Sequence, residues 1–141
     1  MLDKTFRFDV RIYWEDTDAG GIVYHSNYLR FMERARTEML RSLGFSQQQM
    51  REAGEALIVV SKLEITYRRP AKLDDLLTVH TRVESLKHAS VIFEQTITRG
   101  DEVITQGRVR CASISAATGM PTEISPRVRQ AFLDYLEEPG D

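Results

Sequence analysis

EDTDAGGIVYHSNYLRFMERAR, residues 15–36, is the stretch that most strongly constrains the fold of this chain. It begins with acidic residues, passes through the glycine pair 20–21, and reaches His25 just before an amphipathic segment. From Tyr28 onward the apolar side chains recur every three or four positions, as on one face of a helix. The face comprises Tyr28, Met32, Ala35, Met39 and Leu43, and Leu29, Phe31 and Leu40 widen it. A helix this apolar is expected to be largely covered by other structure.

The ends of this helix carry recognisable signals. Ser26 or Asn27 is a suitable N-cap, Arg41 lies in the last turn, and Gly44 fits the position just after the helix. The following residues 46–54, SQQQMREAG, are compatible with a short second helix or with a loop. The pattern therefore predicts one long helix near the start of the chain.

Strand patterns surround the helix. Residues 6–14 alternate, with Phe6, Phe8, Val10, Ile12 and Trp14 on one face. After the helix, the strand-like segments are 57–68, 76–85, 90–99 and 102–116, with a hairpin turn at Gly100–Asp101, and 126–136 is predicted to be a helix with Pro126 in its first turn.

This order predicts a single α+β domain over residues 1–141, in which a five-stranded antiparallel sheet wraps around one long helix. Short connections favour antiparallel pairing, because parallel strands need long crossovers. Such a sheet has exposed edges, and homo-oligomerisation is the usual way to cover them. We therefore expect at least a dimer.

Bulk properties narrow the class of protein. The 141 residues carry a net charge of -2 without a basic stripe, so nucleic acid is not an expected partner. No apolar run approaches the ~20 residues that span a bilayer, and the N-terminus lacks the apolar core of a signal peptide. The single cysteine, Cys111, excludes an internal disulfide and fits a buried thiol in a reducing compartment. The expected location is cytoplasmic.

Several interpretations compete for DTDAGG. It fits a simple tight loop, because Asp and Gly are common turn residues. A calcium loop is rejected, because Gly20 stands where such a loop wants Asp or Asn and Asn27 stands where it wants a bidentate Glu. Zinc is not expected, because His80 and His88 lie on later segments far along the chain from His25. No serine stands in a nucleophile elbow. We therefore do not expect a metal site.

The remaining interpretation is acyl-transfer chemistry without a metal. Gly20 and Gly21 let the backbone bend and approach a ligand closely. The helix start presents unpaired N–H groups and a positive dipole end, which suit a carbonyl that becomes negative during reaction. Asp18 is a candidate nucleophile or general base. His25 is a candidate for orienting the substrate or handling a proton.

A family resemblance supports this interpretation. Residues 10–45 and 58–77, with the pattern DTD-x-x-G-x-VYH-x-NY, resemble hotdog-fold acyl-CoA thioesterases of the 4-hydroxybenzoyl-CoA thioesterase superfamily, most closely the Tol-Pal-associated YbgC-like subfamily. The resemblance implies a hotdog fold, a dimer or tetramer with sites at the interface, and acyl-CoA hydrolysis without a metal or cofactor. It matches Asp18 to the catalytic aspartate and His25 to the histidine of the VYH segment. It also implies a link to Tol-Pal or membrane lipid metabolism, which would place the protein at the inner face of the cell membrane.

The resemblance also suggests substrate-binding positions. Trp14 stands where relatives often carry a tyrosine, and Gly21 and Tyr24 belong to the loop motif. Val60 and Ser61 lie on a strand that passes near the pantetheine arm in the family, although strand alternation alone places Val59 and Val60 in the core.

Further along, Lys87 and His88 match a turn whose basic residues meet the CoA phosphates in relatives; a solvated turn is the alternative. Two other functions remain open. Dehydratase or hydratase chemistry also occurs on hotdog folds, but the DTD…VYH pattern argues against it. The alternative from another class is an acyl-CoA-binding or scaffold protein of the envelope machinery with little turnover.

Overall fold

The computed structural model describes residues 4–136, so the outermost ends of the predicted domain 1–141 lie outside the described part. The elements follow the predicted order of strand, long helix and four further strands. They are β1 (Phe6–Arg11), α1 (Asn27–Ser42), α2 (Gln47–Glu52), β2 (Leu57–Tyr67), β3 (Leu76–Leu86), β4 (Ser90–Arg99), β5 (Glu102–Ile114) and α3 (Pro126–Leu133), with a short 3-10 turn at Trp14–Asp16. Among the described helices, none is long and apolar enough to cross a membrane.

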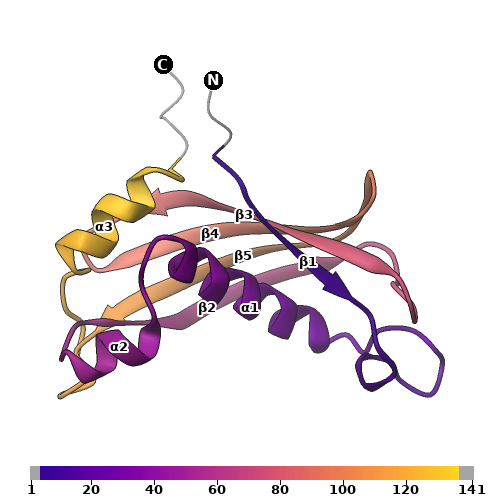
Figure 1. The fold of residues 1–141 in the computed structure, drawn as a ribbon, viewed down its shortest axis with the longest axis horizontal. Helices are drawn as coiled ribbons and strands as arrows, with labels where there is room; N and C mark the ends of the chain where they lie inside the picture. The colour runs from indigo at the N-terminus through magenta and orange to yellow at the C-terminus, as the bar shows by residue number, and fades with distance from the viewer. Residues whose placement is uncertain (1–3, 137–141) are drawn as a thin grey trace.

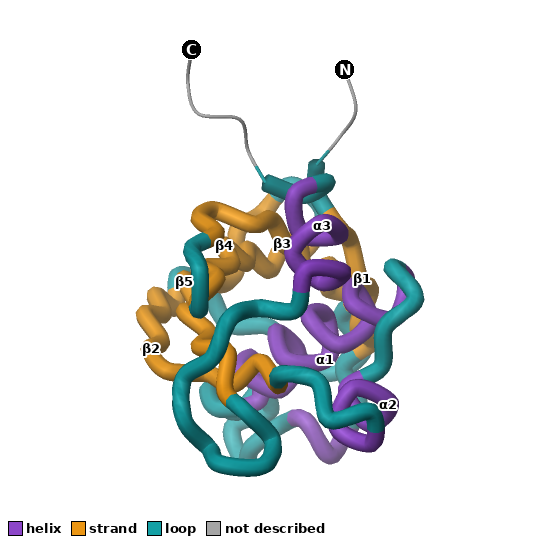
Figure 2. The backbone as a smooth tube through the Cα atoms, turned by 90° about the vertical axis from the view of Figure 1, so that its left-hand side faces the viewer, coloured by secondary structure: helices purple, strands orange, loops and turns teal. Residues whose placement is uncertain are grey.

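The strands form one antiparallel sheet in the order β1-β3-β4-β5-β2, which confirms the predicted architecture. Strands β1 and β2 are its two edges. Register shifts at Ser61 in β2 and at Glu84 in β3 mark bulges, which bend and twist a sheet. The sheet curves around α1, with α2 and α3 at one end and the loop between β1 and α1 at the other (Figures 1 and 2).

Helix α1 buries the predicted apolar face against the concave side of the sheet. Tyr28, Phe31, Met32, Ala35, Met39 and Leu40 are all buried. Met32 lies so close to β5 that a Cβ on Gly107 would be 2.9 Å from its Cε atom. Glycine at position 107 therefore permits the close approach of helix and sheet.

The ends of α1 confirm one of the two predicted caps. Gly44 has a φ of +92° and follows the helix, and the Gly44 and Phe45 N–H groups donate to the carbonyls of Arg41 and Leu40. This is the Schellman arrangement, which needs a residue with positive φ at this position. At the other end, Ser26 is the N-cap residue by position, but its side chain makes no capping hydrogen bond. The helix start therefore keeps N–H groups that are not satisfied by a cap.

Two predictions about strands were wrong. The first strand ends at Arg11 instead of residue 14, because the chain turns there: Ile12 exchanges hydrogen bonds with residues 74–75, and the 3-10 turn follows. Trp14 therefore does not lie on the inner face and is 77% exposed. Val59 and Val60 are not core residues in the single chain, where they are 38% and 51% exposed. Val60 lies on the inner face of the edge strand β2, which α1 leaves uncovered because it packs against β1 and β3, whereas Val59, one position earlier, points to the opposite face of the sheet.

Candidate active site

The loop between β1 and α1 is held at both ends by the segment that precedes β3. Ile12 N–H donates to the Asp75 carbonyl (2.9 Å), and Val23 N–H donates to the Ala71 carbonyl (2.8 Å). The buried Ala71 N–H in turn donates to the Tyr28 hydroxyl at 3.1 Å. These bonds tie residues 12–28 to a single strap, residues 71–75, so the loop has a defined shape.

Hydrogen bonds within the loop set the position of Asp18. Its N–H donates to the Ile22 carbonyl (2.9 Å), its carbonyl accepts from Gly21 N–H (3.0 Å), and its Oδ1 accepts from Gly20 N–H (2.8 Å). Gly21 has a φ of +80°, which only glycine adopts without strain. The Asp18 carboxylate is exposed, and within residues 4–136 its Oδ2 has no hydrogen-bond partner. The free oxygen is available to a substrate or to water.

Asp16 serves the loop instead of the substrate. Its carboxylate accepts from Tyr13 N–H (2.9 Å), and its carbonyl accepts from Tyr24 N–H (3.0 Å) and from the Asn27 side-chain amide (2.9 Å). Asn27 is buried at the first position of α1. The Asn27 side chain, at the start of α1, therefore fixes the junction between the loop and the helix.

The helix start offers backbone donors beside His25. Asn27 N–H donates to the Tyr24 carbonyl (2.9 Å), but the N–H groups of His25 and Ser26 have no acceptor in the described part of the chain. They lie at the positive end of the α1 dipole. An oxygen that gains negative charge would be stabilised there.

An aromatic cluster surrounds the His25 ring. Tyr24 packs against it with ring centroids 4.5 Å apart, and Tyr67 meets it edge-on at 6.2 Å. The Tyr67 hydroxyl donates to the His25 carbonyl at 3.1 Å. Tyr67 was not among the predicted site residues, because only the tertiary fold brings the end of β2 to this loop. Nothing in its strand pattern distinguishes it from its neighbours.

The predicted site residues fall into three groups in this chain. Asp18, Gly21, Tyr24 and His25 share the loop, with Trp14 at its start. Val60 and Ser61 lie six or seven residues before Tyr67 on β2, which is roughly 20 Å along a strand. The Ser61 hydroxyl is bound by Arg110, at 2.6 Å from its Nη1.

Lys87 and His88 form the third group, at the opposite end of the sheet. They follow β3, whereas the loop with Asp18 lies beside the start of that strand (Figure 1). Arg129 of α3 donates to the carbonyls of both residues, and His88 Nδ1 lies 3.6 Å from Glu123 Oε2. The turn is therefore braced by the C-terminal helix and does not meet Asp18 within one chain.

Comparison with known proteins defines the class to which this fold and loop belong. The sequence profile of the thioesterase-like superfamily matches residues 12–132. The chain belongs to this superfamily.

Individual relatives narrow the resemblance. The acyl-CoA thioesterase YbgC of Haemophilus influenzae is 46% identical over 132 residues, which cover 94% of this chain and 97% of that protein. The acyl-CoA thioester hydrolase YbgC of Escherichia coli O6:H1 is 48% identical over 104 residues, covering 74% of this chain and 77% of its own length. A probable thioesterase from Bartonella henselae is a similar solved structure, with a TM-score of 0.81, 37% identity, and coverage of 86% of this chain and 99% of that one. These relatives confirm the predicted hotdog fold and the YbgC-like resemblance.

Proposed function

We propose that this protein hydrolyses acyl-CoA thioesters to the free acid and CoA at the loop that carries Asp18. The observation that carries the proposal is that one loop holds both a free, exposed carboxylate and two unpaired N–H groups at the start of a helix. The names of the YbgC relatives, acyl-CoA thioesterase and acyl-CoA thioester hydrolase, support the same reaction.

The geometry suggests a division of roles. The N–H groups of His25 and Ser26 would polarise the thioester carbonyl and stabilise the oxyanion. Asp18 would then act in one of two ways. As a general base, it takes a proton from water while the water oxygen attacks the carbonyl carbon. As a nucleophile, it attacks the carbon itself, and water hydrolyses the resulting anhydride. In both routes the C–S bond breaks and CoA leaves as the thiolate, which takes up a proton.

A second copy of the chain would complete the site. β2 is an edge strand with exposed apolar side chains, including Val60 and Tyr67. The middle residue of Leu57–Tyr67 is Lys62, and antiparallel pairing of two copies about this point sets the start of one β2 beside the end of the other. Leu57 of one copy would then lie beside Tyr67 and the His25 loop of the other, and Val60 and Ser61 would lie beside Glu64 and Leu63, about 10 Å along the strand from Tyr67. The exposed Trp14 and Tyr24 would flank the acyl group, and the Lys87–His88 turn of a second copy is the proposed contact for the CoA phosphates.

Thiol release from acyl-CoAs of increasing chain length tests the proposal. Asp18→Asn should lower kcat by about 10²- to 10⁴-fold without changing the fold. Glu15→Gln is the matched control, since it removes an exposed negative charge from the same loop. Near-full turnover in Asp18→Asn would refute the role of Asp18. A folded wild-type protein that binds acyl-CoA without turnover would favour the scaffold function.

Single-turnover hydrolysis in water labelled with oxygen-18 separates the two routes. Label in the Asp18 carboxylate after one turnover identifies the nucleophile route, because it arises only when water attacks the Asp18 carbonyl of the anhydride. Direct attack by water places the label only in the released acid.

A further inference from the structure

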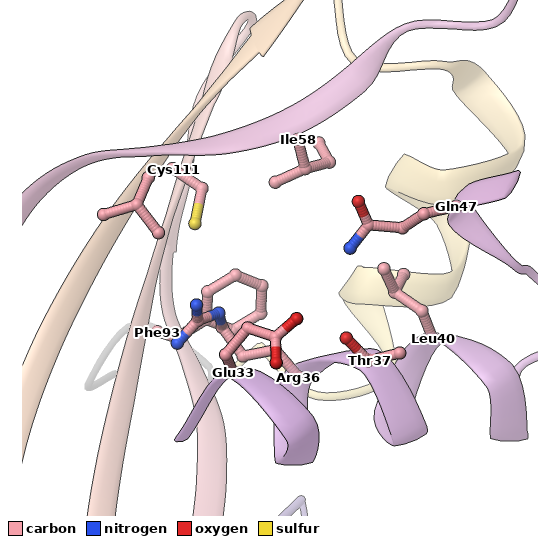
Figure 3. A pocket seen from close by; sticks show the side chains of 9 residues that line it. Glu33, Arg36, Thr37, Leu40, Gln47, Ile58, Phe93 and Cys111 are labelled. Carbon is pink, nitrogen blue, oxygen red and sulfur yellow. The ribbon is translucent and has the colours of Figure 1, made fainter. Parts of the chain in front are cut away.

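A cavity of about 160 Å³ lies between α1 and β2, beside the second half of the helix (Figure 3). Its apolar wall includes Ile58 and Phe93. Glu33, Arg36 and Thr37 of α1 and Gln47 of α2 supply polar groups. The cavity therefore combines an apolar wall with a few converging polar groups, as small-ligand sites do.

Arg36 is held in place by a buried polar network. Its Nη1 donates to Gln95 Oε1 at 2.9 Å. Gln95 is fully buried, and its amide nitrogen donates to the Met32 carbonyl and to the Thr81 hydroxyl, each at 2.9 Å. Because both amide protons are used, the Gln95 oxygen must face Arg36. The guanidinium is thus oriented by the core and not by solvent.

The charge of Arg36 is not balanced by an ion pair. No carboxylate in residues 4–136 lies within 4 Å of its guanidinium nitrogens. Burial lowers the pKa of Arg36, and the nearby Cys111 and Glu33 oppose that shift. Arg36 is half-buried, and its guanidinium has five N–H donors, of which the bond to Gln95 uses one. Its remaining donors are available to an anion in the cavity.

We propose that this cavity binds a carboxylate carried on a short carbon chain, with Arg36 as the binding residue. A guanidinium matches a carboxylate by two parallel hydrogen bonds. A cavity of about 150 Å³ in another protein holds benzene, which has six heavy atoms. The cavity here, at about 160 Å³, therefore suits a molecule the size of butyrate. Ile58 and Phe93 would contact the carbon chain.

Two sources could supply this carboxylate. One is a free short-chain acid, the class of product that the proposed hydrolysis releases. The other is the distal carboxylate of a dicarboxylic acyl group, and this source rests on the proposed function. Val60 lines the cavity and belongs to the strand proposed to adjoin the acyl site, which is why an acyl group is considered.

A binding experiment tests the cavity without any turnover. Calorimetric titration and thermal unfolding compare butyrate with butyramide, which has the same shape but no charge. Wild type should bind butyrate at least about tenfold more tightly, and Arg36→Gln should lose that preference. Glu33→Gln, which removes a negative charge from the same cavity, should tighten butyrate binding by about two- to fivefold. Asp18→Asn should bind butyrate like wild type.

Equal binding of butyrate and butyramide by wild type would overturn the proposal, and this comparison needs no variant. Unchanged butyrate binding in a folded Arg36→Gln protein would also overturn it. If Arg36→Gln does not fold, Arg36→Lys replaces it. Lysine keeps the positive charge but cannot make the two parallel hydrogen bonds of a guanidinium. This variant should therefore bind butyrate more weakly than wild type does, yet more tightly than it binds butyramide.

Kinetics distinguish the sources. If the acyl group supplies the carboxylate, wild type should prefer glutaryl-CoA to butyryl-CoA, and the ratio of their kcat/KM values should fall about tenfold or more in Arg36→Gln. If a free acid occupies the cavity, that ratio should not change, while butyrate binding is still lost. Turnover of no thioester in the chain-length series, these two included, would refute the proposed hydrolysis and leave the butyrate titration to decide the carboxylate site.

Discussion

Tyr28→Phe is the substitution that best tests how the fold supports the loop. The Tyr28 side chain is only 3% exposed, and its hydroxyl accepts the N–H of Ala71, which is fully buried. Phenylalanine keeps the ring contacts with Phe31 and Tyr67, whose centroids lie at 6.1 and 5.8 Å. The substitution therefore removes one hydrogen bond and leaves the shape of the core unchanged.

The expected loss in the free energy of unfolding comes from the Ala71 amide, which loses its hydrogen-bond acceptor. A buried N–H left without a partner costs about 1–3 kcal/mol. For a chain of this length each kcal/mol lowers Tm by about 3 °C, so a decrease of about 3–9 °C is expected. Ala71 also accepts from Val23 N–H, so kcat should fall as well if the strap positions the Asp18 loop.

Urea unfolding followed by circular dichroism measures the difference in the free energy of unfolding. Tyr135→Phe is the matched control: its hydroxyl has no hydrogen-bond partner among residues 4–136, and its ring packs edge-on against Phe6. The control should stay within about 0.5 kcal/mol of wild type. A Tyr28→Phe protein as stable as this control would refute the reasoning about the buried amide.

Three further predictions concern other parts of the molecule. Burial raises the pKa of Asp75, but hydrogen bonds from Lys72 N–H and Arg99 and the charge of Arg99 outweigh it and bring the pKa below its usual range. That stabilisation is present above the ordinary value near 4 and is lost as pH falls through the lowered value. The difference in unfolding free energy between wild type and Asp75→Asn should therefore be largest near neutral pH and should disappear in acid. A difference that stays constant with pH in urea titrations would contradict this. Val60→Lys should convert the proposed dimer to a monomer in sedimentation experiments, because a charge on the exposed β2 edge opposes pairing; an intact dimer would argue against pairing through β2. Burial raises the pKa of the Cys111 thiol, so iodoacetamide should label it much more slowly in the folded protein than in urea, and equal rates would show that it is accessible.

Much of the architecture follows from local patterns that the tertiary structure does not override. The three-to-four spacing from Tyr28 to Leu43 predicted α1, and Gly44 predicted its end, because helix periodicity and a positive φ are local requirements. The strand-like segments 76–85 and 90–99 likewise predicted β3 and β4, which lie inside the sheet and bury about every second side chain. The loop with Asp18 and His25 could be singled out because its residue types and its place before a helix are both visible in the sequence.

The alternation of apolar residues did not predict the structure correctly where burial depends on residues distant in the chain. Val59 and Val60 have the same pattern as core residues, but β2 is an edge strand, and both are exposed. Val60 is on the inner face, which α1 leaves uncovered by packing toward β1 and β3, and Val59 is on the opposite face. Trp14 continues the period of β1 in sequence, yet the bonds of Ile12 to residues 74–75 end the strand before it.

The sequence by itself determined the helix, the order of the strands and the candidate chemistry of the loop, because each depends on residues close together in the chain. Only the tertiary structure decided which residues far apart in the chain contact one another. It brought Tyr67 to His25 and Ala71 to Tyr28, and it placed Arg36 on a buried glutamine beside a cavity. Those contacts join residues about 40 to 60 positions apart, and their geometry is set by how the sheet curves around the helix and not by any local pattern.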